Sequence, residues 1–261
     1  MVKKVGIIGS EGWVGKAMKS VFPDAVCFDP ILEGSKIEDT NKCDIVFICV
    51  PTPNREDGTL DTSIVEESVK NCYASMLVIR STVNPGDCQY WEGKYDVNIC
   101  MQPEYLGETV AHPLLDESDR PFLVIGGRPE CRRRLIELYH EVYNANINIR
   151  QVSLMEAEVI KLSENRAIAY KVAQCQELYD ACEKNGVDYY TVRDAVYGDD
   201  PRFNLWFTFI YPDKRGFRSK CIPKDIYAWS AWAGKPELME SLLAYNNKLL
   251  KGNDADINNS I

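Results

Sequence analysis

The chain has 261 residues, 45% of them hydrophobic and 26% charged, which is enough to bury a full core and to form two domains. A net charge of −9 argues against nucleic acid or an anionic membrane as the main partner and favours small-molecule chemistry. The ten cysteines include no CxxC pair, so we expect most of them to be buried, reduced thiols of a cytoplasmic protein without a metal site. No apolar run approaches the roughly 20 residues of a membrane span.

Short apolar runs alternate with helical patterns in the first half of the chain. The expected strands are 5–8, 25–28, 45–50, 77–79, 97–101 and 122–125, and the expected helices are 15–21, 63–73 and 129–143. A series of strand–helix–strand units requires a doubly wound, mostly parallel sheet with helices on its faces. We therefore predict an α/β domain over residues 1–150.

The pattern changes near residue 150. Residues 154–184 form a long helical stretch without proline or glycine, and Gly186 is suited to end it. Later segments are typical of helices except for a loop near 198–222. The sequence thus predicts a second, smaller, all-helical domain over residues 151–261.

A glycine-rich segment, residues 9–15, follows the first expected strand and precedes a helix. Glycines at such a place permit a tight turn and let the backbone approach a pyrophosphate at a helix N-terminus. Asp29 ends the second strand, 20 residues after Gly9, where a carboxylate accepts from both hydroxyls of an adenosine ribose and repels a 2′-phosphate. The spacing is GxxGxxG rather than GxGxxG, and glycines that only tighten a turn are the alternative. We expect a Rossmann-type site for NAD that includes Gly9, Gly12, Trp13, Val14 and Asp29.

Polar segments follow three other expected strands. Residues 50–53 and 80–83 end two buried strands, so both should open onto the carboxyl edge of the sheet, where α/β proteins bind ligands. Glu104 and Glu108 lie four residues apart after a third strand, and a carboxylate near the cofactor can activate water. Ordinary strand-end loops and a solvated acidic turn are the alternative interpretations.

The second half contributes an amine, an amide and a thiol. Lys161 and Asn165 lie one turn apart on the expected long helix, and two such donors in a dry cleft can stabilise an oxyanion, although two surface side chains are the alternative. Cys221 has charged neighbours suited to tune a thiol, with Lys161 and Lys224 as the candidate cations. After a nucleotide-binding opening, this cysteine suggests an oxidoreductase with a covalent step.

Six segments, in this order, resemble the UDP-glucose/GDP-mannose dehydrogenases. They are Val50-Pro51-Thr52-Pro53, Ser81-Thr82-Val83, residues 103–108, residues 115–126, Lys161 with Asn165, and Cys221 with Lys224-Asp225. The resemblance runs from residue 3 to about 250 and covers a Rossmann domain and a helical dimerisation domain. The family's third domain, which binds much of the nucleotide of the substrate, has no counterpart here. We therefore expect weak binding of a nucleotide sugar unless another chain completes the site or the substrate is smaller.

The resemblance implies NAD-dependent oxidation of a sugar's primary alcohol to a carboxylate through a thiohemiacetal and a thioester. Cys221 matches the nucleophile, Asp225 the acid that orients water or assists the thiol, and Lys161 with Asn165 the groups that stabilise oxyanions. Glu104 matches the acid that activates water for thioester hydrolysis. The catalytic residues implied are Cys221, Lys161, Asn165, Asp225, Glu104 and Thr82, the last of which positions water.

The resemblance also implies binding roles. Arg202 matches an arginine that reaches the partner subunit's substrate site, which implies a homodimer through the helical domain. Besides the glycine-rich segment and Asp29, the implied cofactor site includes Val50, Pro51, Thr52, Ser81, Thr82, Glu108 and Lys224. The implied substrate site includes Glu104, Tyr105, Leu106, Lys161, Asn165, Arg202, Gly216 and Cys221.

One loop departs from the family pattern. The approach to the cysteine, usually GFGGxC, here is Gly216-Phe217-Arg218-Ser219-Lys220-Cys221, so that Arg218 and Lys220 either clash with a hexose or contact phosphates.

Two other functions stay open. One is a two-electron β-hydroxyacid dehydrogenase, which also uses a Lys and an Asn one turn apart but no cysteine. The other is a non-catalytic NAD-binding homologue or partner subunit.

Overall fold

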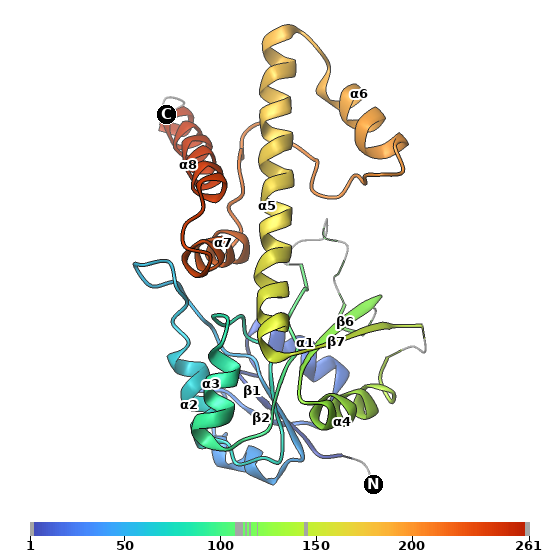
Figure 1. The fold of residues 1–261 in the computed structure, drawn as a ribbon, viewed down its shortest axis with the longest axis vertical. Helices are drawn as coiled ribbons and strands as arrows, with labels where there is room; N and C mark the ends of the chain where they lie inside the picture. Colours follow the sequence, from blue (N-terminus) through green and yellow to red (C-terminus); the bar gives the residue numbers. More distant parts are fainter. Residues whose placement is uncertain are drawn as a thin grey trace. The chain divides into compact units, whose positions relative to one another are not determined.

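The computed structural model describes residues 3–107, 112, 114, 116–118, 120–143 and 146–258. The chain forms two compact units, Met1–Lys161 and Leu162–Ile261. Helix α5 (Leu154–Asn185) begins in the first unit and ends in the second (Figure 1).

A seven-stranded sheet forms the centre of the first unit. Its strands, in spatial order β2-β1-β3-β4-β5-β6-β7, are β1 (Val5–Ile8), β2 (Val26–Phe28), β3 (Ile45–Ile48), β4 (Leu77–Ile79), β5 (Ile99–Met101), β6 (Phe122–Gly127) and β7 (Asn148–Val152). Every pair of neighbouring strands is parallel except the pair of β5 with β6, which is antiparallel. The predicted mostly parallel α/β architecture is confirmed. Its cause is the series of short runs that are apolar on both faces.

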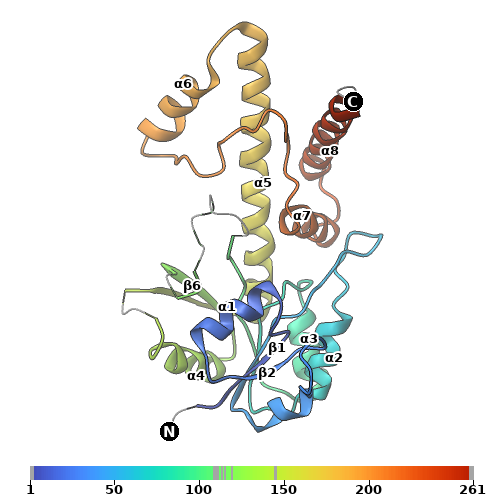
Figure 2. The same cartoon turned by 180° about the vertical axis from the view of Figure 1, so that it is seen from behind.

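Helices cover both faces of this sheet, as Figures 1 and 2 show from opposite sides. On one face, α1 (Trp13–Val21) and α4 (Pro129–Tyr139) pack against strand residues such as Phe47. On the other face, α2 (Ser63–Asn71) and α3 (Asp87–Tyr95) pack against strand residues such as Ile48. Because β3 has buried residues on both faces, it lies at the centre of the core.

Three elements of the first unit are absent from the sequence prediction. Helix α3 has no apolar stripe, since its buried residues are only Cys88 and Trp91. The edge strand β7 includes the exposed residues Arg150 and Gln151, so it lacks the apolar run that marks the central strands. The short 3₁₀ helix η1 (Ile37–Lys42) is polar along its length.

The second unit is helical, as predicted. Beyond α5 it contains α6 (Tyr189–Arg193), the π-helical turn η2 (Asp194–Asp199), α7 (Cys221–Trp232) and α8 (Glu237–Asn258). Ala169 and Ala173 of α5 share an apolar cluster with Ile226 of α7 and Met239 of α8. Small residues on α5 thus form part of the contact with the two later helices.

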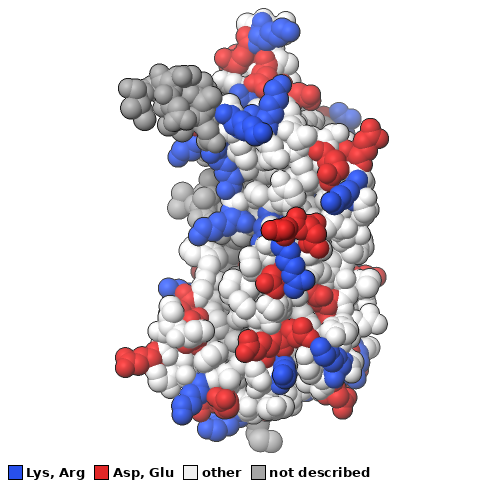
Figure 3. All heavy atoms as spheres, turned by 90° about the vertical axis from the view of Figure 1, so that its left-hand side faces the viewer, with Lys and Arg blue, Asp and Glu red and all other residues white. Residues whose placement is uncertain are grey.

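Charged side chains of both signs are distributed over the surface. Lys and Arg intermingle with Asp and Glu across the face drawn in Figure 3. Among the described residues, no helix combines the length and the apolar character that crossing a bilayer requires. The expectation of a small-molecule partner stays a prediction.

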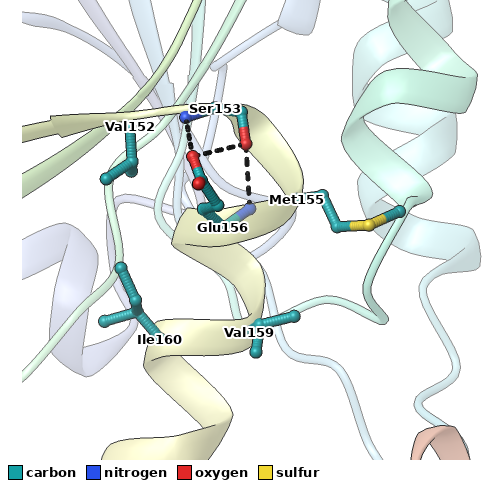
Figure 4. Close-up of a pocket in the computed structure, with 6 residues that line it drawn as sticks. All are labelled: Val152, Ser153, Met155, Glu156, Val159 and Ile160. Atoms are coloured by element: carbon teal, nitrogen blue, oxygen red, sulfur yellow. Dashed lines mark hydrogen bonds between the residues drawn. The ribbon is translucent and has the colours of Figure 1, made fainter.

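A capping box begins α5 (Figure 4). The Ser153 backbone amide donates to Glu156 Oε2 over 2.7 Å, and the Glu156 amide donates to Ser153 Oγ over 3.3 Å. The pair thus satisfies two backbone donors that a helix N-terminus leaves without intrahelical partners. It also fixes where the helix starts directly after β7.

We expect Ser153→Ala to lower the free energy of unfolding by about 1 kcal/mol, because the Glu156 amide loses its acceptor. Urea unfolding followed by circular dichroism measures the change. Ser153→Thr keeps the hydroxyl and serves as the control. Equal stability of the alanine and threonine variants would contradict a stabilising cap.

Candidate active site

The glycine-rich segment forms a tight turn between β1 and α1. Gly9 has a φ of +81°, and a Cβ atom there would lie 2.6 Å from the carbonyl oxygen of Cys49. A Cβ atom on Gly15 would lie 2.0 Å from the carbonyl oxygen of Gly9. Only glycine fits at these two positions, so the turn lies close against the first turn of α1. The N-terminus of that helix, capped by Gly12, offers backbone amides to an anion.

Asp29 follows β2 and is bonded to the same turn. Its Oδ2 accepts from the Glu11 amide at 3.0 Å, and its Oδ1 accepts from the Ile31 amide at 3.2 Å. A carboxylate has about four acceptor positions, so these bonds leave capacity for ribose hydroxyls. The turn and the oriented carboxylate together fit a dinucleotide.

Hydrogen bonds join the ends of β3 and β4. Thr52 Oγ1 donates to the Thr82 carbonyl over 2.7 Å, and Ser81 Oγ donates to the Val50 carbonyl over 2.7 Å. The structure therefore brings together the two predicted strand-end segments at the carboxyl edge of the sheet, as parallel pairing requires.

Glu104, after β5, belongs to a buried group of charges that the sequence analysis missed. Its carboxylate pairs with Arg80 and Arg120, and Glu117 pairs with the same two arginines. The side chains of Arg80, Arg120 and Glu117 are 0% exposed, and that of Glu104 is 11% exposed. We call these four residues the ionic cluster. Its two positive and two negative charges balance.

The charges of the cluster keep Glu104 ionised. Burial opposes ionisation, but the charges of Arg80 and Arg120 outweigh it and lower the pKa of Glu104 to about 2. The backbone amide of Leu106, which donates to Glu104, acts in the same direction. Glu104 is thus a fixed negative charge at neutral pH.

Lys161, on α5, lies beside an aromatic ring. Its Nζ is 5.1 Å from the ring centroid of Tyr105, and the residue is 8% exposed. It makes no ion pair with any residue that the structure describes. A nearly buried ammonium without a carboxylate partner can stabilise an anion.

In the second unit, α5 and α7 bring Asn165 and Asp225 together. Asn165 Nδ2 donates to Asp225 Oδ2 over 2.6 Å, and Lys224 Nζ lies 2.7 Å from Asp225 Oδ1. Asp225 is 1% exposed. Cys221 is the first residue of α7, one turn before Asp225, and it is exposed, whereas the other nine cysteines are buried or half-buried. A thiolate at this position would be stabilised by the positive end of the helix.

The remaining predicted residues have other positions. Arg202 is exposed and pairs with Asp200 at 2.6 Å. Gly216 precedes Phe217, whose amide donates to Asn246 Oδ1 over 2.8 Å. Trp13 is exposed, Val14 and Leu106 are half-buried, and Glu108 lies outside the described residues.

The pocket of Figure 4 lies at the start of α5, and its lining ends one residue before Lys161 in sequence. The residues that line it are Val152, Ser153, Met155, Glu156, Val159 and Ile160. None of these lining residues is among the predicted site residues.

The sequence analysis also missed Glu158. Its buried carboxylate accepts from the Gly86 amide at 2.6 Å and from the Cys88 amide at 2.9 Å, at the N-terminus of α3. It lies one turn before Lys161 between apolar neighbours, a position that does signal burial. For the ionic cluster the signals are that Arg80 follows a buried strand directly and that Glu117 and Arg120 lie within residues 115–126, one of the six segments of the resemblance.

Comparison with known proteins assigns the family. Residues 31–166 match the NAD binding domain of the UDP-glucose/GDP-mannose dehydrogenase family, and residues 155–248 match its central domain. The chain belongs to this family. The glycine-rich turn precedes the matched range, so its assignment depends on the geometry described above.

Individual relatives agree. The chain is 32% identical over 218 residues to the UDP-glucose 6-dehydrogenase of Rickettsia typhi, covering 76% of this chain and 48% of the relative. It is 28% identical to the GDP-mannose 6-dehydrogenase of Pseudomonas syringae pv. syringae, covering 83% and 52%. The solved structure of a UDP-glucose dehydrogenase from Pyrobaculum islandicum superimposes with a TM-score of 0.80 at 21% identity, covering 95% and 68%. The chain spans about half the length of the curated relatives it matches.

The lowered pKa of Glu104 predicts a pH-dependent stability. Its folded pKa of about 2 lies below the ordinary value of 4.5, so its contribution is present above pH 4.5 and is lost as the pH falls toward 2. We expect the stability difference between wild type and Glu104→Gln to shrink on the order of 3 kcal/mol over that interval. Urea unfolding at successive pH values measures it. Glu67→Gln, at an exposed position of α2, controls for the loss of one surface carboxylate.

Proposed function

We propose that the chain oxidises the primary alcohol of a sugar nucleotide to a carboxylate in two NAD-dependent steps. Bound NAD accepts one hydride in each step. The observation that supports this most is the bond between Asn165 and Asp225, two predicted catalytic residues sixty positions apart, next to a helix that begins at the exposed Cys221.

Each residue of the proposed mechanism has a distinct task. After the first hydride leaves, the Cys221 thiolate adds to the aldehyde carbon and gives a thiohemiacetal, whose carbon loses the second hydride to become a thioester. Lys161 and Asn165 stabilise the negative oxygen in these steps. Asp225 orients Asn165 and assists the thiol. Water, which Thr82 positions, then cleaves the thioester and frees the thiol.

The buried ammonium of Lys161, which makes no ion pair with a described residue, and the turn around Gly9 support the assignment of oxyanion and cofactor sites. Because the chain spans about half of its curated relatives, the sugar and the nucleotide are left open. A β-hydroxyacid dehydrogenase would use Lys161 and Asn165 but would need no thiol. A non-catalytic homologue would bind NAD and turn nothing over.

The stoichiometry of NADH separates these functions. With UDP-glucose or GDP-mannose as the substrate, we expect two NADH for each molecule oxidised. Absorbance at 340 nm measures the NADH, and product analysis measures the substrate consumed. One NADH with a β-hydroxyacid would favour the second function. Binding of NAD without turnover of any of these substrates would favour the third.

Cys221→Ser should abolish acid formation and leave NAD affinity unchanged, because the hydroxyl is a far weaker nucleophile than a thiolate. Acid yield by mass spectrometry and NAD titration by calorimetry measure the two effects. Cys27→Ser is the matched control, since a hydroxyl can keep the bond to the Ala25 carbonyl. An unchanged acid yield in Cys221→Ser would contradict the covalent mechanism.

We also propose a homodimer through the helical domain, with Arg202 reaching the partner's substrate site. The segment after Arg202 exposes an unusual number of large apolar side chains, each 47% to 56% exposed: Phe203, Leu205, Trp206, Phe209 and Tyr211. Clustered exposed aromatics are typical of protein interfaces.

Trp206→Glu should therefore shift the protein from dimer to monomer, because an ionised carboxylate replaces an apolar contact. Light scattering after size exclusion gives the mass. Tyr73→Glu, at an aromatic residue 75% exposed in the first unit, is the control and should stay dimeric. A wild-type protein that is monomeric at micromolar concentration would contradict the proposal.

A further inference from the structure

The glycine-rich turn contains a carboxylate, that of Glu11, between Gly9 and Gly12. The spacing GxxGxxG places one residue more between these two glycines than GxGxxG does. The Glu11 amide donates to Asp29 Oδ2 over 3.0 Å, and the Gly9 amide donates to the Phe28 carbonyl over 2.8 Å. These bonds hold the backbone of Glu11 at the end of β2, beside the carboxylate of Asp29.

Glu11 forms an ion pair with Lys19, which lies in the last turn of α1. Its Oε1 accepts from Lys19 Nζ at 2.7 Å and from Ser10 Oγ at 3.3 Å. The side chains of Glu11 and Lys19 are 21% and 39% exposed. The hydrogen bond to Glu11 is the main cause that raises the pKa of Lys19, and the charge of Asp29 acts in the same direction. The ammonium of Lys19 is therefore held at Glu11, within electrostatic range of Asp29.

The charges around Asp29 decide which adenosine ribose this turn can accept. A carboxylate at the end of the second strand accepts from the ribose hydroxyls of NAD, whereas a cation near that place accommodates the 2′-phosphate of NADP. Lys19 is a cation near that place, but its ammonium is bonded to Glu11. Together, Glu11, Asp29 and Lys19 bring two negative charges and one positive charge to the end of β2. A phosphate dianion is repelled by this balance of charges.

We propose that Glu11 determines the choice of cofactor together with Asp29, because its bond to Lys19 withholds that ammonium from the 2′-phosphate of NADP. The ion pair itself is neutral, so it costs the binding of NAD little. A residue that only shaped the turn would change the affinities for both dinucleotides equally. The inference concerns binding of the cofactor, and so it does not depend on which sugar is oxidised.

Glu11→Gln removes the charge and keeps an oxygen that can accept from Lys19 and Ser10. We expect its affinity for NADP to rise about tenfold, because Lys19 becomes available to the phosphate, and its affinity for NAD to stay within about threefold of wild type. Isothermal titration calorimetry with each dinucleotide measures both affinities. Glu67→Gln, at an exposed position of α2, loses one carboxylate elsewhere and should leave both unchanged. An unaltered ratio of the two affinities in Glu11→Gln would overturn the proposal.

Two double variants test whether the gain comes from Lys19. Adding Lys19→Gln to Glu11→Gln should return the NADP-to-NAD affinity ratio to that of wild type, because no freed ammonium is left for the phosphate. Lys16→Gln is the matched control. Lys16 is exposed on the same helix, and after the hydrogen bond from Lys19 its charge also lowers the pKa of Glu11. Adding Lys16→Gln should keep most of the gain in the ratio. A gain that survives Lys19→Gln, or that both additions remove equally, would contradict the proposal.

Two smaller probes locate the effect at the ribose. Adenosine 5′-monophosphate and adenosine 2′,5′-bisphosphate differ only in the 2′-phosphate, and neither carries a nicotinamide. Glu11→Gln should strengthen binding of the bisphosphate and leave that of the monophosphate unchanged, as measured by competition with bound NADH fluorescence. Equal strengthening of both probes would place the effect at the 5′-phosphate and overturn the proposal. Because these measurements need no turnover, a protein that binds NAD but oxidises no nucleotide sugar would refute the proposed function and leave this test of the inference intact.

Discussion

The burial of Arg80 is the constraint on which the carboxyl edge of the sheet depends. A guanidinium that is 0% exposed needs carboxylates, and Arg80 obtains them from Glu104 after β5 and Glu117 before β6. Tyr143, after α4, adds a hydrogen bond of 2.8 Å to Glu117. The ion pairs and this hydrogen bond therefore tie segments from the end of β4 to the end of α4 together at the edge where an α/β protein binds its ligands. Apolar packing fixes the strands themselves, and the charges fix the segments at the strand ends.

A second buried carboxylate anchors the first turns of α5. Glu158 accepts from two amides at the N-terminus of α3, and these bonds hold the first turns of α5 against α3. Burial raises the pKa of Glu158, while the backbone amides partly offset that rise. Because helical side chains three residues apart share a face, the rotation fixed at Glu158 also determines the direction of Lys161, one turn later in the same unit. One contact thus orients a proposed oxyanion donor.

The sequence was sufficient to predict those elements whose signal lies in a short stretch of neighbouring residues. The buried strands β1 and β4, the long helix α5 and the all-helical second unit follow from short apolar runs and from the absence of proline and glycine over thirty residues. Helix α3 and edge strand β7 were missed because tertiary contacts, and not periodicity, stabilise them. The same division holds at the site. Motif order singled out Asn165 and Asp225, which the structure joins by a hydrogen bond, but nothing in the spacing indicates that Glu104 meets two arginines from separate segments.

The loop before Cys221, which departs from the family pattern, is held in place by hydrogen bonds to α8. Arg218 stands where the family usually has glycine, and its Nη2 donates to the Leu250 carbonyl of α8 over 3.2 Å. One residue earlier, the backbone of Phe217 bonds through both its amide and its carbonyl to Asn246 of the same helix. The conformation that glycines would leave open is thus restrained by α8. Because Cys221 begins α7 directly after this segment, bonds to α8 limit the positions that its thiol can adopt.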